Sequence, residues 1–333
     1  AYCRFVPERL DDFAWENDRV AFRMYGPKMW TLPEKRCGSG IDVWVKKVRY
    51  PIINKWMKYR LIGEKYHEDT GEGADFYTVG KSLGCGGLGF WVDGKLHVNR
   101  HYVTHKVIQG EGDRIEFELT YAPLEVDGKT ITETKRISME KGSNLFKVQN
   151  SFEIFGGGSV TAAVGIVLRA GDDDLRHGKN WLGYAEPDSP KNGQTYCGVV
   201  LKSPAEFKEA DGHAMLLVPV KSGDTLTYFA GAAWSKGLDF KNTSEWMAYV
   251  AAQATSGYFS KVDPKKGETS EWFSNWPAGK SPMEIGKRVA ENFLPQGHYQ
   301  TTVVTHKNGN YKGTGTHRTW RNVVYPEVCV WFG

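Results

Sequence analysis

The sequence predicts an all-β fold, a large antiparallel β-sandwich with a few short helices. Of the 333 residues, 38 are glycine and 13% are aromatic, a composition that favours strands joined by turns. Apolar and polar residues alternate over much of the stretch from residue 97 to residue 170, which is the period of a half-buried strand. Many antiparallel strands with few helices imply two sheets packed face to face, whose concave outer face or rim could hold a ligand.

The individual elements follow from this alternation and from the turn signals between strands. Ile115, Phe117 and Leu119 alternate with polar neighbours, as one strand of an antiparallel meander does. The further expected strands are 20–24, 130–140, 145–154, 160–168, 196–201, 214–219 and 225–234. Apolar residues with the spacing of a helix face occur at 244–254 and 281–294.

The length of the chain allows one domain or two closely packed layers. Because no internal repeat has a fixed period and no linker forces a boundary, we expect a single domain over residues 1–333. Residues 296–333 match no recognisable pattern, so they are expected to form an extra strand pair or a tail, and they stay an unplaced C-terminal segment.

The charge balance bears on the kind of partner. The net charge is +4, from 43 basic and 39 acidic residues, which is too small an excess for a nucleic-acid-binding protein. A mildly positive chain suits a small anionic substrate. No run of about 18 apolar residues occurs, so we expect no membrane span.

The five cysteines bear on the compartment. They are widely spaced and form no CxxC pair, which argues against a zinc ribbon or a redox motif. One or two disulfides with a thiol left over would fit an exported protein, periplasmic or extracellular. The chain starts at an alanine without a signal-peptide pattern, so we expect a processed product.

The segment 66–81 is the first candidate site. Titratable side chains of several kinds stand there among glycines, which suits a polar pocket better than a hydrophobic core. We predict His67 and Tyr77 as catalytic residues and Asp75 and Lys81 as substrate-binding residues. A structural calcium ion among the carboxylates of this segment is the alternative, and no other metal or cofactor is expected.

The segment 6–26 is the second candidate site, because its charges alternate in sign around aromatic rings that could form a platform for a flat polar ligand. We predict Arg23 as catalytic, on the face of a strand opposite its apolar residues. The alternative is an edge strand with solvated charges. The residues of this segment expected to bind substrate are Arg9, Asp12, Trp15, Glu16, Asn17 and Tyr25.

A run of histidines follows at 97–105. On one strand His97, Asn99, His101, Val103 and His105 would share a face, at steps of about 6.6–7 Å, which is too wide for them to hold one zinc ion without other ligands. We predict His101 and His105 as catalytic candidates lining a cleft. An exposed polar sheet face is the alternative.

Three further residues complete the expected substrate-binding set. Arg100 lies within the histidine run, and His177 and Trp181 lie in a long polar segment at 172–193. Loops of that length in compact domains are commonly functional, so we expect these side chains at the site.

Several of these motifs also carry a family resemblance. They are VPER at 6–9, DFAWEND at 12–18, FRMYG at 22–26, YH at 66–67, GEG at 71–73, DFY at 75–77 and VG at 79–80. Together they resemble the DUF4861 family over roughly residues 5–260, and residues 133–145 are similar to strand pairs of galactose-mutarotase-like β-sandwiches. The sequence departs from the expected pattern at Thr70, where a second histidine would stand.

The resemblance implies a β-supersandwich with a carbohydrate-active role in exported bacterial systems that degrade uronate-rich polysaccharides. Its implied activity is that of a lyase or dehydratase acting on a terminal uronic acid. Elimination across C4–C5 needs a base, an acid and a cation that neutralises the carboxylate, for which Arg9, Arg23 and Arg100 are candidates.

Two other functions stay open. Paired carboxylates, for example Glu16 with Asp75 or Glu186, would instead serve a glycoside hydrolase or an epimerase. A non-catalytic glycan-binding protein would use the rings of Trp15, Trp181 and Trp234.

Overall fold

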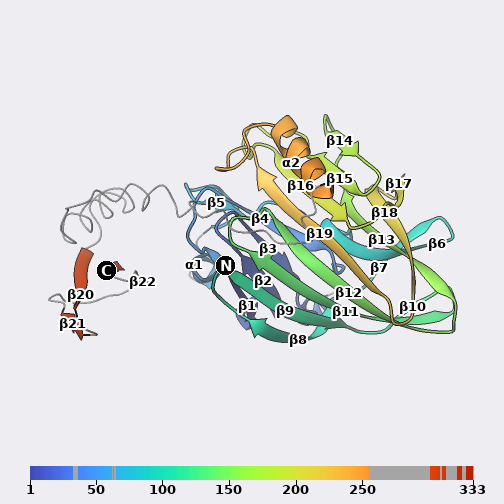
Figure 1. Cartoon of the computed structure of the whole chain (residues 1–333), viewed down its shortest axis with the longest axis horizontal. Helices are drawn as coiled ribbons and strands as arrows, with labels where there is room; N and C mark the ends of the chain where they lie inside the picture. The colour runs from blue at the N-terminus through green and yellow to red at the C-terminus, as the bar shows by residue number, and fades with distance from the viewer. Residues whose placement is uncertain are drawn as a thin grey trace. The chain divides into compact units, whose positions relative to one another are not determined.

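The computed structural model describes residues 1–32, 37–61, 63 and 65–255, and the backbone of four strands between residues 301 and 332. The chain divides into two compact units, Ala1–Pro264 and Lys265–Gly333 (Figure 1). The prediction of a single domain over residues 1–333, with 296–333 unplaced, stays a prediction.

The first unit begins with a five-stranded antiparallel sheet in the order β1-β2-β3-β4-β5. Its strands are β1 (Tyr2–Val6), β2 (Asp12–Glu16), β3 (Val20–Met24), β4 (Ile41–Lys46) and β5 (Gly73–Ala74). The connections hold two 3₁₀ helices, η1 (Pro7–Arg9) and η2 (Pro27–Thr31), and the helix α1 (Ile53–Leu61).

Two further antiparallel sheets complete this unit. The larger has nine strands in the order β14-β15-β16-β19-β12-β11-β9-β8, with β10 paired to β11, and the smaller has the order β17-β18-β13-β6-β7. The strands of the larger sheet are β8 (Tyr102–Gln109), β9 (Arg114–Tyr121), β10 (Leu124–Val126), β11 (Lys129–Glu140), β12 (Leu145–Phe155), β14 (Asp174–His177), β15 (Trp181–Ala185), β16 (Thr195–Leu201) and β19 (Thr225–Trp234). Those of the smaller sheet are β6 (Cys85–Val92), β7 (Lys95–Val98), β13 (Ser159–Val167), β17 (Glu206–Ala210) and β18 (His213–Lys221).

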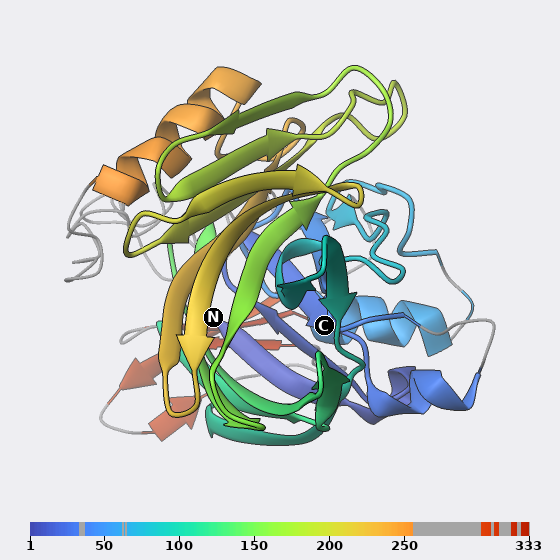
Figure 2. The ribbon, with the colours of Figure 1, turned by 90° about the vertical axis from the view of Figure 1, so that its right-hand side faces the viewer.

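One hydrophobic core joins the three sheets. Phe22 of β3, Phe90 of β6 and Phe146 of β12 all belong to it and are fully buried. The two five-stranded sheets therefore pack on the same face of the nine-stranded sheet, as a β-sandwich requires. The helix α2 (Thr243–Thr255) packs on the opposite face of the large sheet, over β15 and β16 (Figure 2).

The second unit holds a four-stranded antiparallel sheet in the order β21-β20-β23-β22. Its strands are β20 (Thr301–Lys307), β21 (Asn310–Lys312), β22 (Arg321–Val324) and β23 (Val328–Phe332). Strands are thus present in the segment that the sequence left unplaced. In the described part of the chain, no helix is long and apolar enough to cross a lipid bilayer.

The predicted fold class is confirmed, since the described structure is a predominantly antiparallel β-sandwich with the short helices α1 and α2. The expected strand at 225–234 has the observed bounds of β19, and the helix expected at 244–254 is α2. The helix expected at 281–294 lies outside the described residues.

Three expectations were wrong. The segment 172–193 is not a long loop, because it contains the paired strands β14 and β15. The histidine run is not one strand, because it breaks at residues 99–101 between β7 and β8. The expected disulfides are also absent among the four cysteines with described side chains, which are free, buried thiols at Cys3, Cys37, Cys85 and Cys197.

Candidate functional site

An open pocket of about 350 Å³ lies where the two polar segments of the sequence meet. The first segment contributes the end of η1 and the end of β3 with the residue that follows it, and the second contributes His67 before β5 and residues 75–80 after it. The residues that line the pocket are Arg9, Arg23, Tyr25, His67, Asp75, Phe76, Tyr77, Thr78, Val79 and Gly80. Six predicted site residues, namely Arg9, Arg23, Tyr25, His67, Asp75 and Tyr77, are therefore together in one pocket.

The alternation of β3 sets which of its side chains reach the pocket. Phe22 points into the main core, while Arg23 lies on the other face, beside Asp42 on β4 and Ala14 on β2. The same outer face carries Trp44 and packs against α1. Arg23 is only 3% exposed, so the alternative of an edge strand with solvated charges is wrong for this residue.

Three carboxylates surround the guanidinium of Arg23. Its Nη2 donates to Oδ2 of Asp42 and, at 3.1 Å, to Oδ2 of Asp75. Oδ2 of Asp12 lies 3.7 Å from its Nε. The ring centre of Trp44 lies 5.1 Å from the guanidinium carbon. Among the described residues, Nη1 and Nε of Arg23 have no hydrogen-bond partner, although both are buried.

Burial governs the protonation of these carboxylates. Desolvation raises the pKa of Asp12 to about 6, against the opposing charges of Arg23 and Arg9. Desolvation likewise raises the pKa of Asp42 and of Asp75, and again the charge of Arg23 opposes the shift. A buried carboxyl in such a group can hold a proton near neutral pH, as a general acid must.

Arg9 and Tyr25 form the more accessible wall of the pocket. Both are partly exposed, and the guanidinium carbon of Arg9 lies 5.8 Å from the ring centre of Tyr25. Among the described carboxylates, the one paired with Arg9 is Asp12, at 3.7 Å. Burial, followed by the charge of Asp42, raises the pKa of Tyr25, and the Tyr25 hydroxyl accepts a hydrogen bond of 3.3 Å from Nη2 of Arg23. Tyr25 is therefore a protonated phenol that can donate.

His67 is held at the mouth of the pocket with one ring nitrogen engaged. Its Nδ1 lies 2.6 Å from the carbonyl oxygen of Asp75 and 3.6 Å from Oδ2 of the same residue. Since a carbonyl can only accept, a neutral His67 carries its proton on Nδ1 and has a lone pair on Nε2. The His67 side chain is 61% exposed, so this nitrogen is within reach of a ligand.

Tyr77 lines the wall of the pocket, and its hydroxyl group faces the core. It is 6% exposed, and Sγ of Cys197 lies 3.8 Å from its hydroxyl on the core side. The guanidinium carbon of Arg169 lies 5.1 Å from its ring centre, and Arg169 donates to the carbonyl of Thr78 and to Glu186, at 2.9 Å. Arg169 therefore holds the pocket-lining stretch that follows β5.

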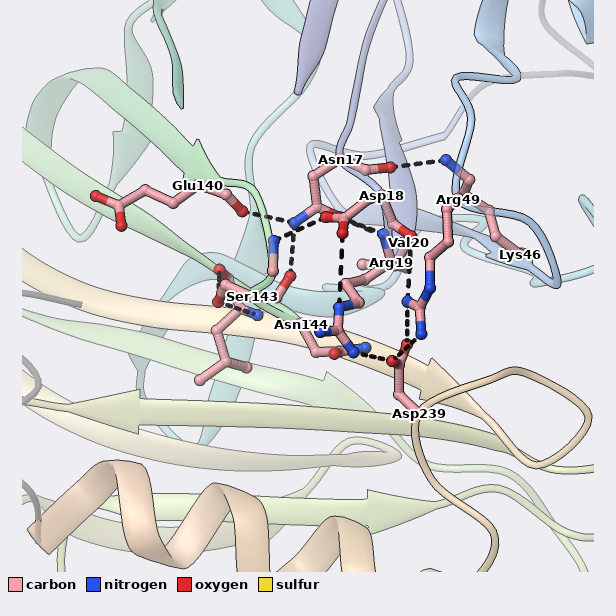
Figure 3. A network of polar contacts seen from close by, with 12 residues as sticks. Asn17, Asp18, Arg19, Val20, Lys46, Arg49, Glu140, Ser143, Asn144 and Asp239 are labelled. Carbon is pink, nitrogen blue, oxygen red and sulfur yellow. Dashed lines mark hydrogen bonds and ion pairs between the residues drawn. The ribbon is translucent and has the colours of Figure 1, made fainter. Parts of the chain in front are cut away.

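Three residues predicted to bind substrate are buried away from the pocket. Trp15 is fully buried against Phe22 and Phe146, and Glu16 is fully buried beside α1. Asn17 donates 2.6 Å hydrogen bonds to the carbonyls of Glu140 and Ser143, which ties the β2–β3 turn to the β11–β12 turn (Figure 3). None of them lines the pocket, so their predicted contact with substrate stays a prediction.

The histidine run and its arginine also lie apart from the pocket lining. His101 is buried, with Nε2 3.3 Å from Sγ of Cys37, and desolvation lowers its pKa to about 4. His105 is exposed on β8 and stacks on Phe5 at 4.5 Å between ring centres. The guanidinium of Arg100 lies 5.3 Å from the ring centre of Trp30.

The remaining predicted residues are distributed over other surfaces. His177 stacks on Phe207 at 3.8 Å between ring centres, on the exposed strand β14. Trp181 packs with the cluster under α2. Lys81 is exposed and adjoins Gly80 of the pocket in sequence. Asp12 lies beneath the pocket, against Arg23.

The structure also bears on the alternative sites that the sequence left open, namely a carboxylate pair, a glycan-binding platform and a calcium site. Glu186 is paired with Arg169, so it and Glu16 do not form a carboxylate pair with Asp75 at the pocket. Trp234 is only 3% exposed, which removes it from a glycan-binding platform. Asp69 is paired with Lys47 and Glu72 with Lys55, and among the described residues no three His, Cys, Asp or Glu converge as a metal site.

Sequence reasoning missed Asp42. It is fully buried, opposite Arg23 in the register of β3 and β4. The signal was present, because this carboxylate interrupts an otherwise apolar run in the strand sequence IDVWVK. The other missed lining residues are Phe76, Thr78, Val79 and Gly80.

Comparison with known proteins gives three kinds of match. A family model described as "Domain of unknown function (DUF4861)" matches residues 1–257. A protein of Formosa agariphila named "Uncharacterized protein P7" is 34% identical over 266 residues, which are 75% of this chain and 66% of that protein. The chain thus spans slightly less than two thirds of this relative.

The solved structures that match are only distantly similar. The GH36 α-galactosidase AgaB from Geobacillus stearothermophilus has a TM-score of 0.36 and 10% identity, covering 70% of this chain and 41% of its own. The 4-α-glucanotransferase from Thermococcus litoralis has a TM-score of 0.34 and 9% identity, covering 67% and 37%. The chain spans about two fifths of these enzymes, and a likeness at this level says nothing of its activity.

Proposed function

The chain belongs to the DUF4861 family, and on that premise we propose that it is a carbohydrate-active lyase or dehydratase. Its substrate would be the terminal uronic acid of an oligosaccharide from an anionic polysaccharide, and its reaction a β-elimination. The observation that carries the proposal is that His67, Tyr25 and the two arginines Arg9 and Arg23 line one pocket. Export to the periplasm or beyond is part of the same proposal, since polysaccharides are degraded outside the cytoplasm.

His67 would be the base. Its Nδ1 is engaged by the carbonyl oxygen of Asp75, so Nε2 is the nitrogen that can take the C5 proton of the sugar. The Asp75 carboxylate, 3.6 Å from Nδ1, would stabilise the imidazolium that forms.

Arg9 would neutralise the sugar carboxylate. Arg9 is the more accessible of the two arginines, because it is partly exposed and its paired carboxylate is 3.7 Å away. Arg23 is already bound to Asp42 and Asp75 through Nη2, so it would share this contact only through its unpartnered Nη1. Neutralising the carboxylate makes the neighbouring C5 proton easier to remove, because negative charge develops there in the transition state.

Tyr25 would be the acid. As the C5–H electron pair forms the C4–C5 double bond, the C4–O bond breaks and its oxygen takes the phenol proton of Tyr25. Arg23, whose guanidinium carbon is 4.7 Å from the ring centre, would stabilise the tyrosinate that remains. The leaving oxygen departs as water in a dehydratase and as a sugar hydroxyl in a lyase.

The test is a panel of uronate-terminated oligosaccharides, followed by ultraviolet absorbance of the unsaturated uronate and by mass spectrometry. We expect His67→Gln and Arg9→Gln each to lower kcat/KM by about 10²–10³-fold, the scale of one lost acid-base or charge contact. His177→Gln is the matched control, because His177 stacks on Phe207 and does not line the pocket. Unchanged activity in the first two variants would refute these roles.

A glycoside hydrolase is the second candidate, because burial raises the pKa of Asp75 and Asp75 lines the pocket. A protonated carboxyl of this kind is what a hydrolase uses as its acid. The same panel separates the two. Release of sugar with gain of water and without a new chromophore would support the hydrolase and end the elimination proposal.

A further inference from the structure

Arg23 and the three carboxylates around it, Asp12, Asp42 and Asp75, form the floor of the pocket, which holds more negative than positive groups. Arg23 on β3 faces Asp12 on β2, Asp42 on β4 and Asp75 after β5, and Arg9 on η1 lies beyond Asp12. With every group ionised, two arginines face three carboxylates. The other titratable groups nearby are Tyr25 and Cys37, whose pKa values burial raises, and His67 at the mouth.

A second observation points to a ligand. Arg23 lines the pocket, its side chain is 3% exposed, and its Nη1 is a buried donor with no partner among the described residues. A buried guanidinium N–H without an acceptor is unfavourable, and such groups are normally satisfied by protein, water or ligand. The acceptor that suits it is an anionic oxygen.

Such an anion conflicts with the charges beneath it. Adding one carboxylate to two arginines and three carboxylates leaves two negative charges in excess within a buried group. Carboxylates that share a site cannot all stay ionised, and the proton that they bind belongs to the group rather than to one residue. The arrival of the anion must therefore raise the proton affinity of the floor.

We infer that this pocket binds a sugar carboxylate together with one proton, which is taken up by the group Asp12, Asp42 and Asp75. The sugar part of the ligand rests on the proposed function. The coupling rests on the arrangement of charges around Arg23, and it makes the pocket selective for anions under mildly acidic conditions.

The sign of the pH dependence follows. At a pH where the carboxyl group of the free protein is fully ionised, the binding of each anion is accompanied by the uptake of one proton from solution. The affinity for the anion therefore falls by about tenfold for each unit of rise in pH. At lower pH the carboxyl group already holds the proton and the affinity becomes constant. A simple arginine site for a carboxylate would show no such dependence near neutral pH.

The experiment is calorimetric titration of the full chain with D-glucuronate at pH 7.5, in two buffers of different ionisation enthalpy. We expect uptake of about one proton for each ligand, an affinity about tenfold weaker at pH 8.5, and no binding of the neutral control D-glucose. Binding of glucuronate without proton uptake would overturn the inference, and so would an absence of glucuronate binding.

Variants assign the proton. Asp42→Asn should bring the uptake towards zero, since two arginines then face two carboxylates, and Asp12→Asn serves if the first variant does not fold. His67→Gln should retain the uptake; its loss in that variant would place the proton on His67 and overturn the assignment. Proton-linked binding without elimination in the oligosaccharide panel would end only the proposed function.

Discussion

Replacing Glu16 by glutamine tests whether this residue is structural, as the fold indicates, or binds substrate, as its sequence suggests. Glu16 is fully buried, and its Oε2 accepts a 2.7 Å hydrogen bond from Nζ of Lys46. Its carboxylate also accepts the backbone N–H groups of Ile52 and Ile53, at 2.8 Å and 3.0 Å, where α1 begins. Glutamine keeps an acceptor for those N–H groups but removes the charge opposite Lys46.

The magnitude follows from the loss of one partner of a buried ion pair. We expect Glu16→Gln to lower the free energy of unfolding by about 3–5 kcal/mol, because the Lys46 ammonium stays buried without a counter-charge. Urea unfolding followed by tryptophan fluorescence should show a lower midpoint with an unchanged slope. The affinity of the folded variant for an anionic sugar should be unchanged.

Two controls sharpen this test. Glu8→Gln removes the partner of Arg4 in a pair whose side chains are about one quarter exposed, so its effect should stay below about 1 kcal/mol. Adding Lys46→Met to Glu16→Gln should recover part of the lost stability, because no unpaired charge then remains. The reasoning is refuted if Glu16→Gln unfolds like the wild type but loses ligand affinity.

Three other predictions concern groups outside that pair. Asp12→Asn should change how the free energy of unfolding depends on pH. Because burial raises the pKa of Asp12 to about 6, the free energy of unfolding of the wild type should fall by on the order of 2–3 kcal/mol relative to the variant as the pH rises from about 4 to about 6. Urea unfolding at each pH measures this difference. Gly73→Ala should destabilise by more than about 1 kcal/mol, because the new Cβ would lie 2.0 Å from the carbonyl oxygen of Val45, whereas Gly71→Ala, also at positive φ but with no atom within 4 Å, should cost less in the same assay. Iodoacetamide should label the buried thiols of Cys3, Cys37, Cys85 and Cys197 only after denaturation, and no reductant should be needed. Labelling that required a reductant would instead show that these cysteines form disulfides.

The sequence predicts well what depends on local alternation. The strand β19 and its neighbours in the meander follow from residues that alternate between the core and the opposite face. The alternation also predicts which residues of β3 share a face, since Arg23 does lie on the face opposite that of Phe22. Alternation, however, cannot tell whether the second face of a strand meets solvent or another element.

That limit explains why some predicted site residues lie away from the pocket. The outer face of β2, β3 and β4 is covered in part by α1, a short helix whose start is fixed by the carboxylate of Glu16 rather than by its own sequence. Glu16 is therefore buried beside α1, although its residue type suits a ligand. Asn17 is buried for another reason, because it donates to the carbonyls of Glu140 and Ser143 at the β11–β12 turn. Asp42 lies beside Arg23 because of the pairing register of β3 and β4, and no local sequence pattern predicts that register.

Arg169 binds the pocket-lining stretch after β5 through a contact between residues far apart in the sequence, and this affects when the pocket forms during folding. Arg169 follows β13 and reaches the carbonyl of Thr78 across 91 residues, and Arg23 meets Asp75 across 52. Contacts between residues so far apart in sequence form slowly, because a long loop must close before they can be made. The wall of the pocket is therefore complete only after Arg169, which follows β13, has docked on Thr78. Ligand binding during refolding should therefore appear after the rise of β-sheet signal.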